Sequence, residues 1–409
     1  MPTLFAVPDP AERRLLATKP GLLGACLFAL LYLKILISFS IQLGILGALN
    51  YALDFLMFPL LGLVFLLYHR RLSEASRLCV AGLLCFTVYL LIQGAFFGKP
   101  GATVIYYTRF VIPLLLYFAL MLCSANHLSR TGRLTEDMML MVFLLGLAGI
   151  FFMPANYNHE LTKLPTYFSG LHKAAYIFSV ALVVGTVCYS TQARGRRLLL
   201  GALMLFAVFM LLAGWSIRTP LILLAVYFGV LFMSRFGATG KTALYLLAPV
   251  AVIALALAST EFIDWNKISS GRLNMWGVKL QMLADADLLQ FIFGRGFGSD
   301  YIVVDNWYGE KDSHNNYLQT ITELGLVGLA LLLGNIALLY RVQPNLQGRA
   351  LVLGYAATGL FSNGIIYRLL PGYLVAVALA YIAFAARRHY SASLAAPSLT
   401  SHSLTAGRT

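Results

Sequence analysis

Basic side chains stand at the margins of several apolar runs in this chain, where their chemistry could serve a phosphate ligand. They are Arg109, Lys173, Arg218 and Arg368, with Arg272 in a long hydrophilic segment. A guanidinium presents a fixed fork of donors that matches phosphate oxygens, so such a set could bind a lipid-linked diphosphate. Any single one could instead only snorkel to lipid headgroups. Arg218 resists that explanation, because the link Trp215–Pro220 is so short that its charge must remain between two helices.

A histidine ends the same hydrophilic segment, where the next apolar run begins. His314 lies in the stretch Ser313-His-Asn-Asn-Tyr317. Histidine is the side chain best suited to take a proton from a sugar hydroxyl near neutral pH. If the following helix continues back through it, His314, Tyr317 and Thr320 share a face that points into the protein. A lone histidine at a helix start can also be only a cap or a headgroup contact.

The residue pattern gives no support for metal or nucleotide chemistry. Asp285-Ala-Asp287 lies in an apparently amphipathic helix, so its two carboxylates are more simply explained as part of a solvated helix face than as metal ligands. Gly294-Arg-Gly-Phe-Gly298 lacks the lysine and Ser/Thr of a phosphate loop, and predicts a tight turn whose backbone approaches something closely. The five cysteines fall in or beside apolar runs without CxxC spacing. We therefore expect no metal and no cofactor.

The composition requires a bilayer around most of the chain. Of its 409 residues 60% are hydrophobic and 11% are charged, and the mean hydropathy is +0.79. Apolar runs long enough to cross roughly 30 Å of hydrocarbon recur along the chain, without the alternating pattern of a membrane β-barrel. The sequence predicts an all-α polytopic membrane protein with about twelve transmembrane helices. The predicted spans are 21–45, 51–68, 78–97, 108–124, 137–153, 173–191, 198–214, 219–234, 242–259, 317–340, 350–366 and 369–386.

Lysine and arginine gather in every second connection between these spans. Because short cytoplasmic loops carry such charges, the pattern predicts that both termini are cytoplasmic, and it accounts for the net charge of +14 without nucleic acid. The opposite face then carries one large loop, whose five basic and eight acidic residues argue against a polyanion-binding surface. The first apolar run is expected to remain as a signal anchor. The predicted parts are a cytoplasmic segment 1–20, nine spans within 21–259, a periplasmic loop of short helices at 260–316, three spans within 317–386 and a disordered cytoplasmic tail 387–409.

Several short motifs, taken in order, resemble the O-antigen ligase and polymerase superfamily of membrane glycosyltransferases. The motifs are Ser216-Ile-Arg218-Thr219, Ser270-Gly-Arg272 followed by Trp276, Gly294-Arg-Gly-Phe-Gly298, His314-Asn-Asn-Tyr317 and Glu323-Leu-Gly325. The resemblance covers the second half of the chain, and the first half matches only in topology. Two departures are the Ile between Ser216 and Arg218 and the loose form of Gly170-Leu-His172-Lys173.

The resemblance implies a GT-C-like membrane glycosyltransferase in the bacterial inner membrane, with its active site facing the periplasm. The implied function is an O-antigen ligase of lipopolysaccharide biosynthesis. It would transfer O-antigen from undecaprenyl diphosphate to the lipid A core oligosaccharide, and membrane lipids would surround the enzyme. The reaction would need no metal and would invert the anomeric configuration. His314 would be the base, while Arg218 and Arg272 would clamp the diphosphate. Further substrate contacts are expected from Arg109, His172, Lys173, Arg295, Asn315, Tyr317 and Arg368.

Other functions remain open at the level of sequence. An O-antigen polymerase or a pilin oligosaccharyltransferase of the same superfamily would share these motifs. A lipid or solute transporter could use the arginines as a substrate path. The chain has no evident internal repeat and carries a long loop on one face only, which favours an enzyme over a transporter.

Overall fold

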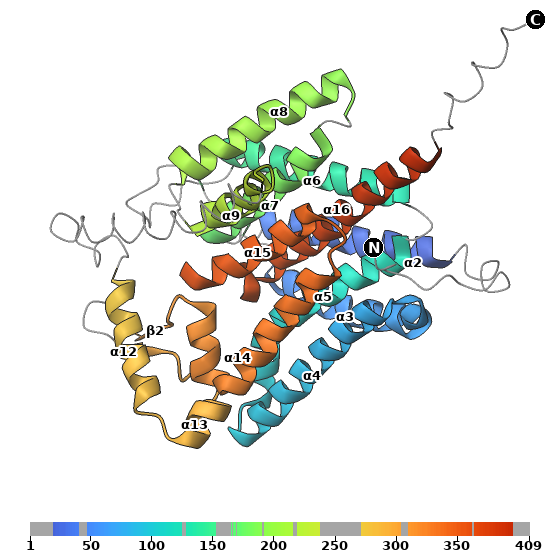
Figure 1. The fold of residues 1–409 in the computed structure, drawn as a ribbon. Coiled ribbons are helices and arrows are strands. Elements are labelled where there is room, and N and C mark those ends of the chain that lie inside the picture. The colour runs from blue at the N-terminus through green and yellow to red at the C-terminus, as the bar shows by residue number, and fades with distance from the viewer. Residues whose placement is uncertain are drawn as a thin grey trace, which may run out of the picture.

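The computed structural model describes residues 19–40, 47–124, 128–152, 165, 167–168, 170–189, 192–215, 219–237, 271–303, 310–361 and 364–395. Helices account for most of these residues (Figure 1). In the first half of the chain they are α2 (Lys19–Ser40), α3 (Gly47–Tyr68), α4 (Glu74–Phe96), α5 (Pro100–Ser124), α6 (Leu128–Phe152), α7 (Leu171–Cys188) and α8 (Arg194–Phe209). In the second half they are α9 (Thr219–Met233), α12 (Arg272–Ala284), α13 (Leu288–Phe293), α14 (Asn316–Val342), α15 (Leu346–Phe361) and α16 (Leu369–Ala395).

Short turns and one small ribbon complete the described elements. The 3₁₀ turns are η2 (His69–Arg71) and η5 (Ile365–Tyr367), and α8 ends in a π-helical turn, η4 (Met210–Gly214). Strands β1 (Ile302–Val303) and β2 (Glu310–Lys311) pair antiparallel, with Ile302 opposite Lys311.

Nine helices in the described part of the chain are long and apolar enough to cross a membrane. They are α2 to α8, α14 and α16, while α9 is apolar but shorter. The prediction of an all-α polytopic membrane protein is therefore confirmed. The predicted spans 219–234 and 350–366 correspond to α9 and α15, which have 15 and 16 residues and are not among these nine. The predicted span 242–259 lies outside the described residues, so the total of about twelve stays a prediction. Helix α16 continues to Ala395, past the predicted end of the last span at 386.

Burial separates central helices from those that face lipid. In α16, 83% of the apolar segment is buried inside the protein, compared with 72% for α5 and α7 and only 28% for α3. Helix α16 packs against both α5 and α7, and these three helices form the centre of the bundle (Figure 1). Helices α3 and α4 leave large side chains such as Phe55, Leu66 and Phe96 uncovered, as an outer surface in lipid requires.

The α12–α13 segment lies at one end of the bundle, where α4 ends and α14 begins (Figure 1). Asp287 caps α13, because its side chain accepts the N–H of Gln290 at 2.8 Å. Tyr89 on α4 donates to the Phe293 carbonyl at 3.3 Å, and Lys99 donates to the Phe297 carbonyl at the same distance. The segment is thus fastened directly to the membrane helices.

Two glycines allow the turn after α13 to dock on a break in α14. Gly294 and Gly325 have φ of 85° and 68°, and Gly325 interrupts the helical backbone of α14. A Cβ on Gly294 would collide with the Glu323 carbonyl, and one on Gly325 with the Ile292 carbonyl. The amide of Gly296 donates to that same Glu323 carbonyl at 3.0 Å. The predicted tight turn with a closely approaching backbone is therefore confirmed, and the partner it approaches is the kink of α14.

Candidate functional site

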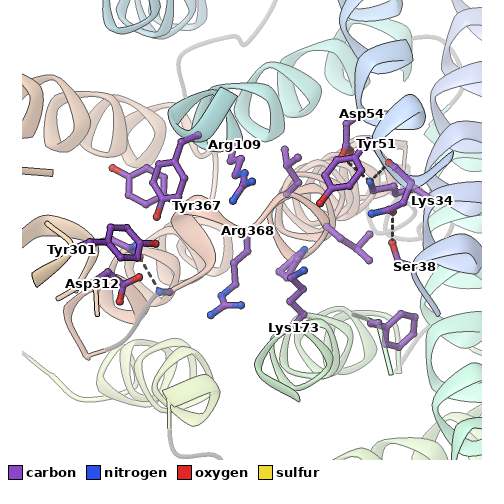
Figure 2. A pocket seen from close by; sticks show the side chains of 18 residues that line it. Lys34, Ser38, Tyr51, Asp54, Arg109, Lys173, Tyr301, Asp312, Tyr367 and Arg368 are labelled. Atoms are coloured by element: carbon purple, nitrogen blue, oxygen red, sulfur yellow. Dashed lines mark hydrogen bonds and ion pairs between the residues drawn. The ribbon is translucent and has the colours of Figure 1, made fainter. Parts of the chain in front are cut away.

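A cavity of about 280 Å³ opens among the helices at one end of the bundle. It lies between the last turns of α2 and the first turns of α3, α5, α7, α14 and α16 (Figure 2). The basic residues of η2, Arg133 of α6 and Arg341 of α14 stand at the opposite ends of their helices. The cavity and the arginine-rich connections therefore occupy opposite ends of the bundle.

Four cations line this cavity: Lys34, Arg109, Lys173 and Arg368. Arg109 lies over the ring of Tyr106 at 5.2 Å from its centroid, a distance at which the ring stabilises a guanidinium. Lys173 lies close enough to the other three cations to interact electrostatically with each of them. Because neighbouring cations repel one another in a site shielded from water, the arrangement favours occupation by an anion.

Arg368 reaches the cavity because the chain turns sharply between α15 and α16. The 3₁₀ turn η5 ends at Tyr367, and the Arg368 amide donates to the Ile365 carbonyl at 2.9 Å. The Arg368 guanidinium then lies over the ring of Tyr176 on α7, 5.8 Å from its centroid. This turn places the side chain between Arg109 and Lys173 (Figure 2).

Two carboxylates line the cavity at opposite ends. Asp54 pairs with Lys34 at 2.7 Å, and Asp312 lies beside Tyr301 at the other end (Figure 2). The four cations exceed the two carboxylates, so the lining has an excess of positive charge that matches a diphosphate diester. Lys34 and Asp54 are not among the residues predicted from the sequence. Each is an ionisable residue inside a predicted apolar span, and that was the signal that could have revealed them.

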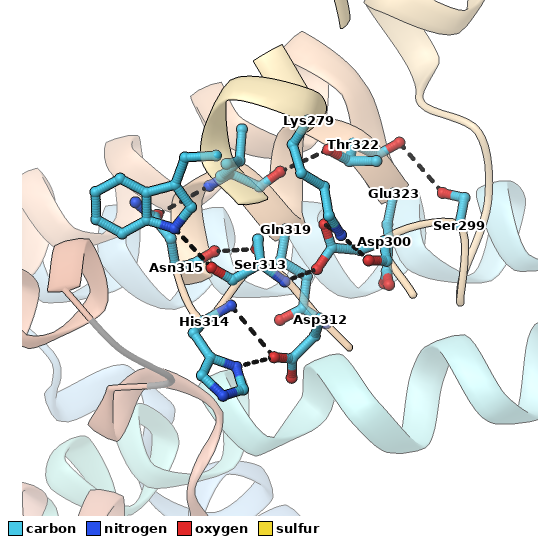
Figure 3. A network of polar contacts seen from close by, with 12 residues as sticks. Lys279, Ser299, Asp300, Asp312, Ser313, His314, Asn315, Gln319, Thr322 and Glu323 are labelled. Atoms are coloured by element: carbon cyan, nitrogen blue, oxygen red, sulfur yellow. Dashed lines mark hydrogen bonds and ion pairs between the residues drawn. The ribbon is translucent and has the colours of Figure 1, made fainter. Parts of the chain in front are cut away.

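His314 lies next to Asp312, a residue of the cavity lining, and is held by it (Figure 3). The Asp312 carboxylate contacts Nδ1 of the imidazole and also accepts the His314 amide at 3.2 Å. When Nδ1–H donates to the carboxylate, the basic lone pair lies on Nε2, as a general base requires. His314 does not itself line the cavity, but its partner Asp312 does.

The expectation that α14 continues back through His314 is wrong. His314 has φ of 47°, Asn315 is extended, and the helix begins at Asn316. A left-handed residue cannot continue a right-handed helix, so His314 and Tyr317 do not share a helical face. His314 points toward Asp312 instead (Figure 3).

Helix α12 fixes the backbone that carries His314 (Figure 3). Lys279 and Asp300 form an ion pair at 2.8 Å with both side chains completely buried. The second oxygen of Asp300 accepts the Ser313 amide at 2.7 Å, while Trp276 Nε1 donates to the Ser313 carbonyl at 2.7 Å. Burial raises the pKa of the Asp300 carboxyl, and the Lys279 ammonium and the Ser313 amide oppose that rise. The amide and the carbonyl of Ser313 are thus both fixed by hydrogen bonds, which constrains the backbone at His314.

Glu323 connects the kink of α14 to its surroundings. Its carboxylate accepts the Tyr107 hydroxyl at 2.7 Å and the Gly298 amide at 3.2 Å. Its backbone carbonyl accepts Gln93 Nε2 at 2.7 Å. These bonds fasten α4, α5 and the glycine turn to one buried residue, and they place Tyr106, the neighbour of Tyr107, against the cavity.

Three of the expected substrate contacts are engaged within the protein. Asn315 caps α14 by accepting the amides of Tyr317 and Leu318, both at 3.0 Å. The Tyr317 hydroxyl donates to the Ala356 carbonyl at 2.7 Å. Arg295 donates to the Met282 carbonyl at 2.6 Å. None of the three lines the cavity.

The remaining predicted residues lie near the cavity or outside the described chain. Arg272 begins α12 and, like Arg368, interacts electrostatically with Tyr176. Burial lowers the pKa of the Arg272 guanidinium, which stays protonated because its ordinary value is so high. His172 precedes Lys173 in the first turn of α7 and is partly buried. Arg218 lies outside the described residues.

The cavity therefore has the parts of a site for an anionic substrate. Cations lie in the middle, a histidine–carboxylate pair lies at one end, and among the described residues no group of three or more histidine, cysteine or acidic side chains could hold a metal ion.

A scan against protein-family models found no match for the chain. No curated protein is similar to it either.

Proposed function

We propose that this protein is a membrane glycosyltransferase of the O-antigen ligase kind, which transfers a glycan from undecaprenyl diphosphate to the lipid A core oligosaccharide. The observation that supports the proposal most directly is the cavity that combines Arg109, Lys173 and Arg368 with the His314–Asp312 pair at its rim. The cations suit a diphosphate, and the pair suits activation of a hydroxyl.

The proposed reaction is a single displacement at the anomeric carbon of the donor. His314 takes the proton of an acceptor hydroxyl, and the oxygen forms a bond to that carbon as the carbon–oxygen bond to diphosphate breaks. The diphosphate leaves with the bonding electrons, and the cavity cations stabilise the charge that develops on it. One backside attack inverts the anomeric configuration.

The proposed compartment is the periplasm, and the active site faces it from the inner membrane. Arginine-rich connections mark the cytoplasmic side of a membrane protein. The cavity lies at the helix ends opposite to those connections, and α12 and α13 lie at the same end as the cavity. Periplasmic acceptors would then meet the cavity beside this loop.

The lipopolysaccharide of a deletion strain tests the proposal. A ligase predicts core oligosaccharide without O-chain, together with accumulated lipid-linked polymer. Core with a single repeat would indicate a polymerase instead, and unchanged lipopolysaccharide would contradict both. Restoration by wild-type protein, and not by the His314→Ala protein at equal abundance, would connect the phenotype to this site.

A further inference from the structure

We propose that the α2–α3 end of the cavity is a separate subsite, in which Lys34 binds the lipid-side phosphate of a polyprenyl diphosphate and Asp54 orients Lys34. This inference rests on the proposed function, because it assumes a diphosphate-linked donor. It assigns a role to a buried ion pair that the displacement reaction does not use.

The position of Lys34 calls for a physical reason. Its side chain is only 4% exposed and lies within a membrane-spanning helix, where a charge is costly. A pair that served only to join α2 to α3 could be replaced by apolar packing at no cost in stability. Lys34 instead lines the cavity together with Arg109, Lys173 and Arg368, which is a position from which it can reach a ligand.

The surrounding hydrogen bonds leave Lys34 able to bind one more acceptor. The ammonium donates to the Asn50 carbonyl at 2.6 Å and to Asp54 at 2.7 Å, and an ammonium has three donors. The other oxygen of Asp54 accepts the Tyr373 hydroxyl at 3.2 Å, which ties it to α16. Asp54 is thus fixed from two sides, and it holds the ammonium in place without using all its donors.

The order of groups along the cavity places this subsite on the lipid side. Figure 2 shows Lys34 and Asp54 at one end and Asp312 at the other, with Arg368 and Lys173 between them. In the proposed reaction the acceptor hydroxyl and the base lie on one side of the donor sugar and the diphosphate lies on the other. The phosphate farthest from His314 is the one that carries the lipid, and it falls at Lys34.

The surface beside this end is apolar, as a polyprenyl chain requires. Leu49, Tyr51 and Phe55 on the first turns of α3 are 41%, 62% and 64% exposed, and Tyr51 also lines the cavity. A lipid whose phosphate sits at Lys34 could therefore leave the cavity past α3 and remain in the bilayer.

The subsite would select a diphosphate over a monophosphate. A monophosphate satisfies the central cations and leaves Lys34 without a ligand, whereas a diphosphate also gains the bond to Lys34. One charge-assisted hydrogen bond corresponds to about a tenfold difference in affinity. Because Lys34 and Asp54 together are neutral, this preference comes from a placed donor and not from net charge.

The test measures binding of undecaprenyl diphosphate and undecaprenyl monophosphate to the purified full-length protein in lipid nanodiscs. The decisive variant is Lys34→Met with Asp54→Leu, which removes the donor while it keeps the net charge of the cavity and replaces the pair by apolar groups. Lys99→Met is the matched control, because Lys99 is an exposed lysine at the same end of the bundle and does not line the cavity.

We expect the wild-type and Lys99→Met proteins to prefer the diphosphate by about tenfold or more. The double variant should lose that preference and still bind the monophosphate as the wild type does. Asp54→Asn alone should bind the monophosphate more tightly, because it removes a negative charge, and should show a smaller preference for the diphosphate, because Lys34 loses the carboxylate that orients it. A double variant that unfolds at the wild-type temperature and keeps the full preference would overturn the subsite. A wild-type protein with no affinity for either lipid would overturn the proposed function itself.

Discussion

The Asp312 carboxylate holds the imidazole of His314 beside the cavity, so the effect of replacing His314 can be predicted. We predict that His314→Ala inserts normally and binds donor as before, but transfers glycan more slowly by roughly 10²–10⁴, the usual contribution of a positioned base. The measurement is turnover of purified protein with donor in excess.

The amide variants His314→Asn and His314→Gln serve as the comparison for His314→Ala. Either amide can keep a hydrogen bond to Asp312, and neither can take a proton at neutral pH. Near-normal turnover in one of them would exclude proton abstraction by His314. The base would then have to be sought among the carboxylates, with Asp312 first.

Arg368 stacks on Tyr176 and faces the cavity, so its shape matters as well as its charge. We predict that Arg368→Ala abolishes donor binding, and that Arg368→Lys restores only part of it because the planar fork is lost. The measurement is the donor affinity of each variant, compared with that of the wild type at equal protein abundance. Equal affinity in the lysine variant would mean that only the charge is needed.

At the scale of single residues, only part of the candidate site can be predicted from the sequence. Positive charge at helix margins stands out against apolar runs, which is why Arg109, Lys173 and Arg368 were predictable, and the structure places all three in one cavity. Lys34 and Asp54 were not predicted, because they lie within apolar runs and become a pair only when α2 and α3 pack together.

Helix α12 acts on the site through the buried pair Lys279–Asp300. We predict that Lys279→Ala lowers the free energy of unfolding by about 3–5 kcal/mol, because it leaves a buried carboxylate without its counter-charge. Turnover should fall as well, since Asp300 also holds the Ser313 amide beside His314. Denaturant unfolding and transfer assays on the purified variant test both statements.

The loss from Lys279→Ala should depend on pH in a defined direction. Burial raises the pKa of Asp300, and removing the ammonium raises it further. Between the ordinary aspartate pKa and the raised value, the folded variant binds a proton that the unfolded chain releases. Its free energy of unfolding therefore falls as pH rises through that interval. A pH-independent difference from the wild type would contradict this account of Asp300.

At the scale of elements, local patterns were predictable and their partners were not. Three glycines in five residues indicated a turn with a closely approaching backbone, and all three have positive φ. Nothing local revealed that this turn docks on Gly325, because the contact joins segments that are distant in sequence and meet only through tertiary packing. The same limit explains His314, whose conformation is set by α12 and not by its neighbours in α14.

For the whole molecule, we predict that the cavity and the α12–α13 segment face the periplasm. Asp285 is exposed after α12, so Asp285→Cys in a protein without its five native cysteines should react with a membrane-impermeant thiol reagent in intact spheroplasts. A cysteine in place of exposed Arg70 in η2 is the control, and it should react only after permeabilisation. The reverse pattern would place the cavity in the cytoplasm and remove the proposed substrates from its reach.

The architecture of the bundle followed from sequence more fully than its site did. Hydropathy and the alternation of basic connections predicted an all-α polytopic protein, and nine candidate spans are present in the described chain. Burial could not be predicted in the same way, because α3 and α16 are similarly apolar and yet 28% and 83% buried. Apolar side chains suit both lipid and protein neighbours, so hydropathy alone does not distinguish them.

The central place of α16 has a consequence for how the protein is made. Helix α16 follows all the other described helices in the sequence, yet it fills the space between α5 and α7 and supplies Arg368 beside its first residue. Membrane helices are synthesised in sequence order, so the earlier helices enter the bilayer around an unfilled centre and remain so until α16 has been made. A chain that stops before residue 369 would leave that centre unfilled and its buried faces open to quality-control proteases.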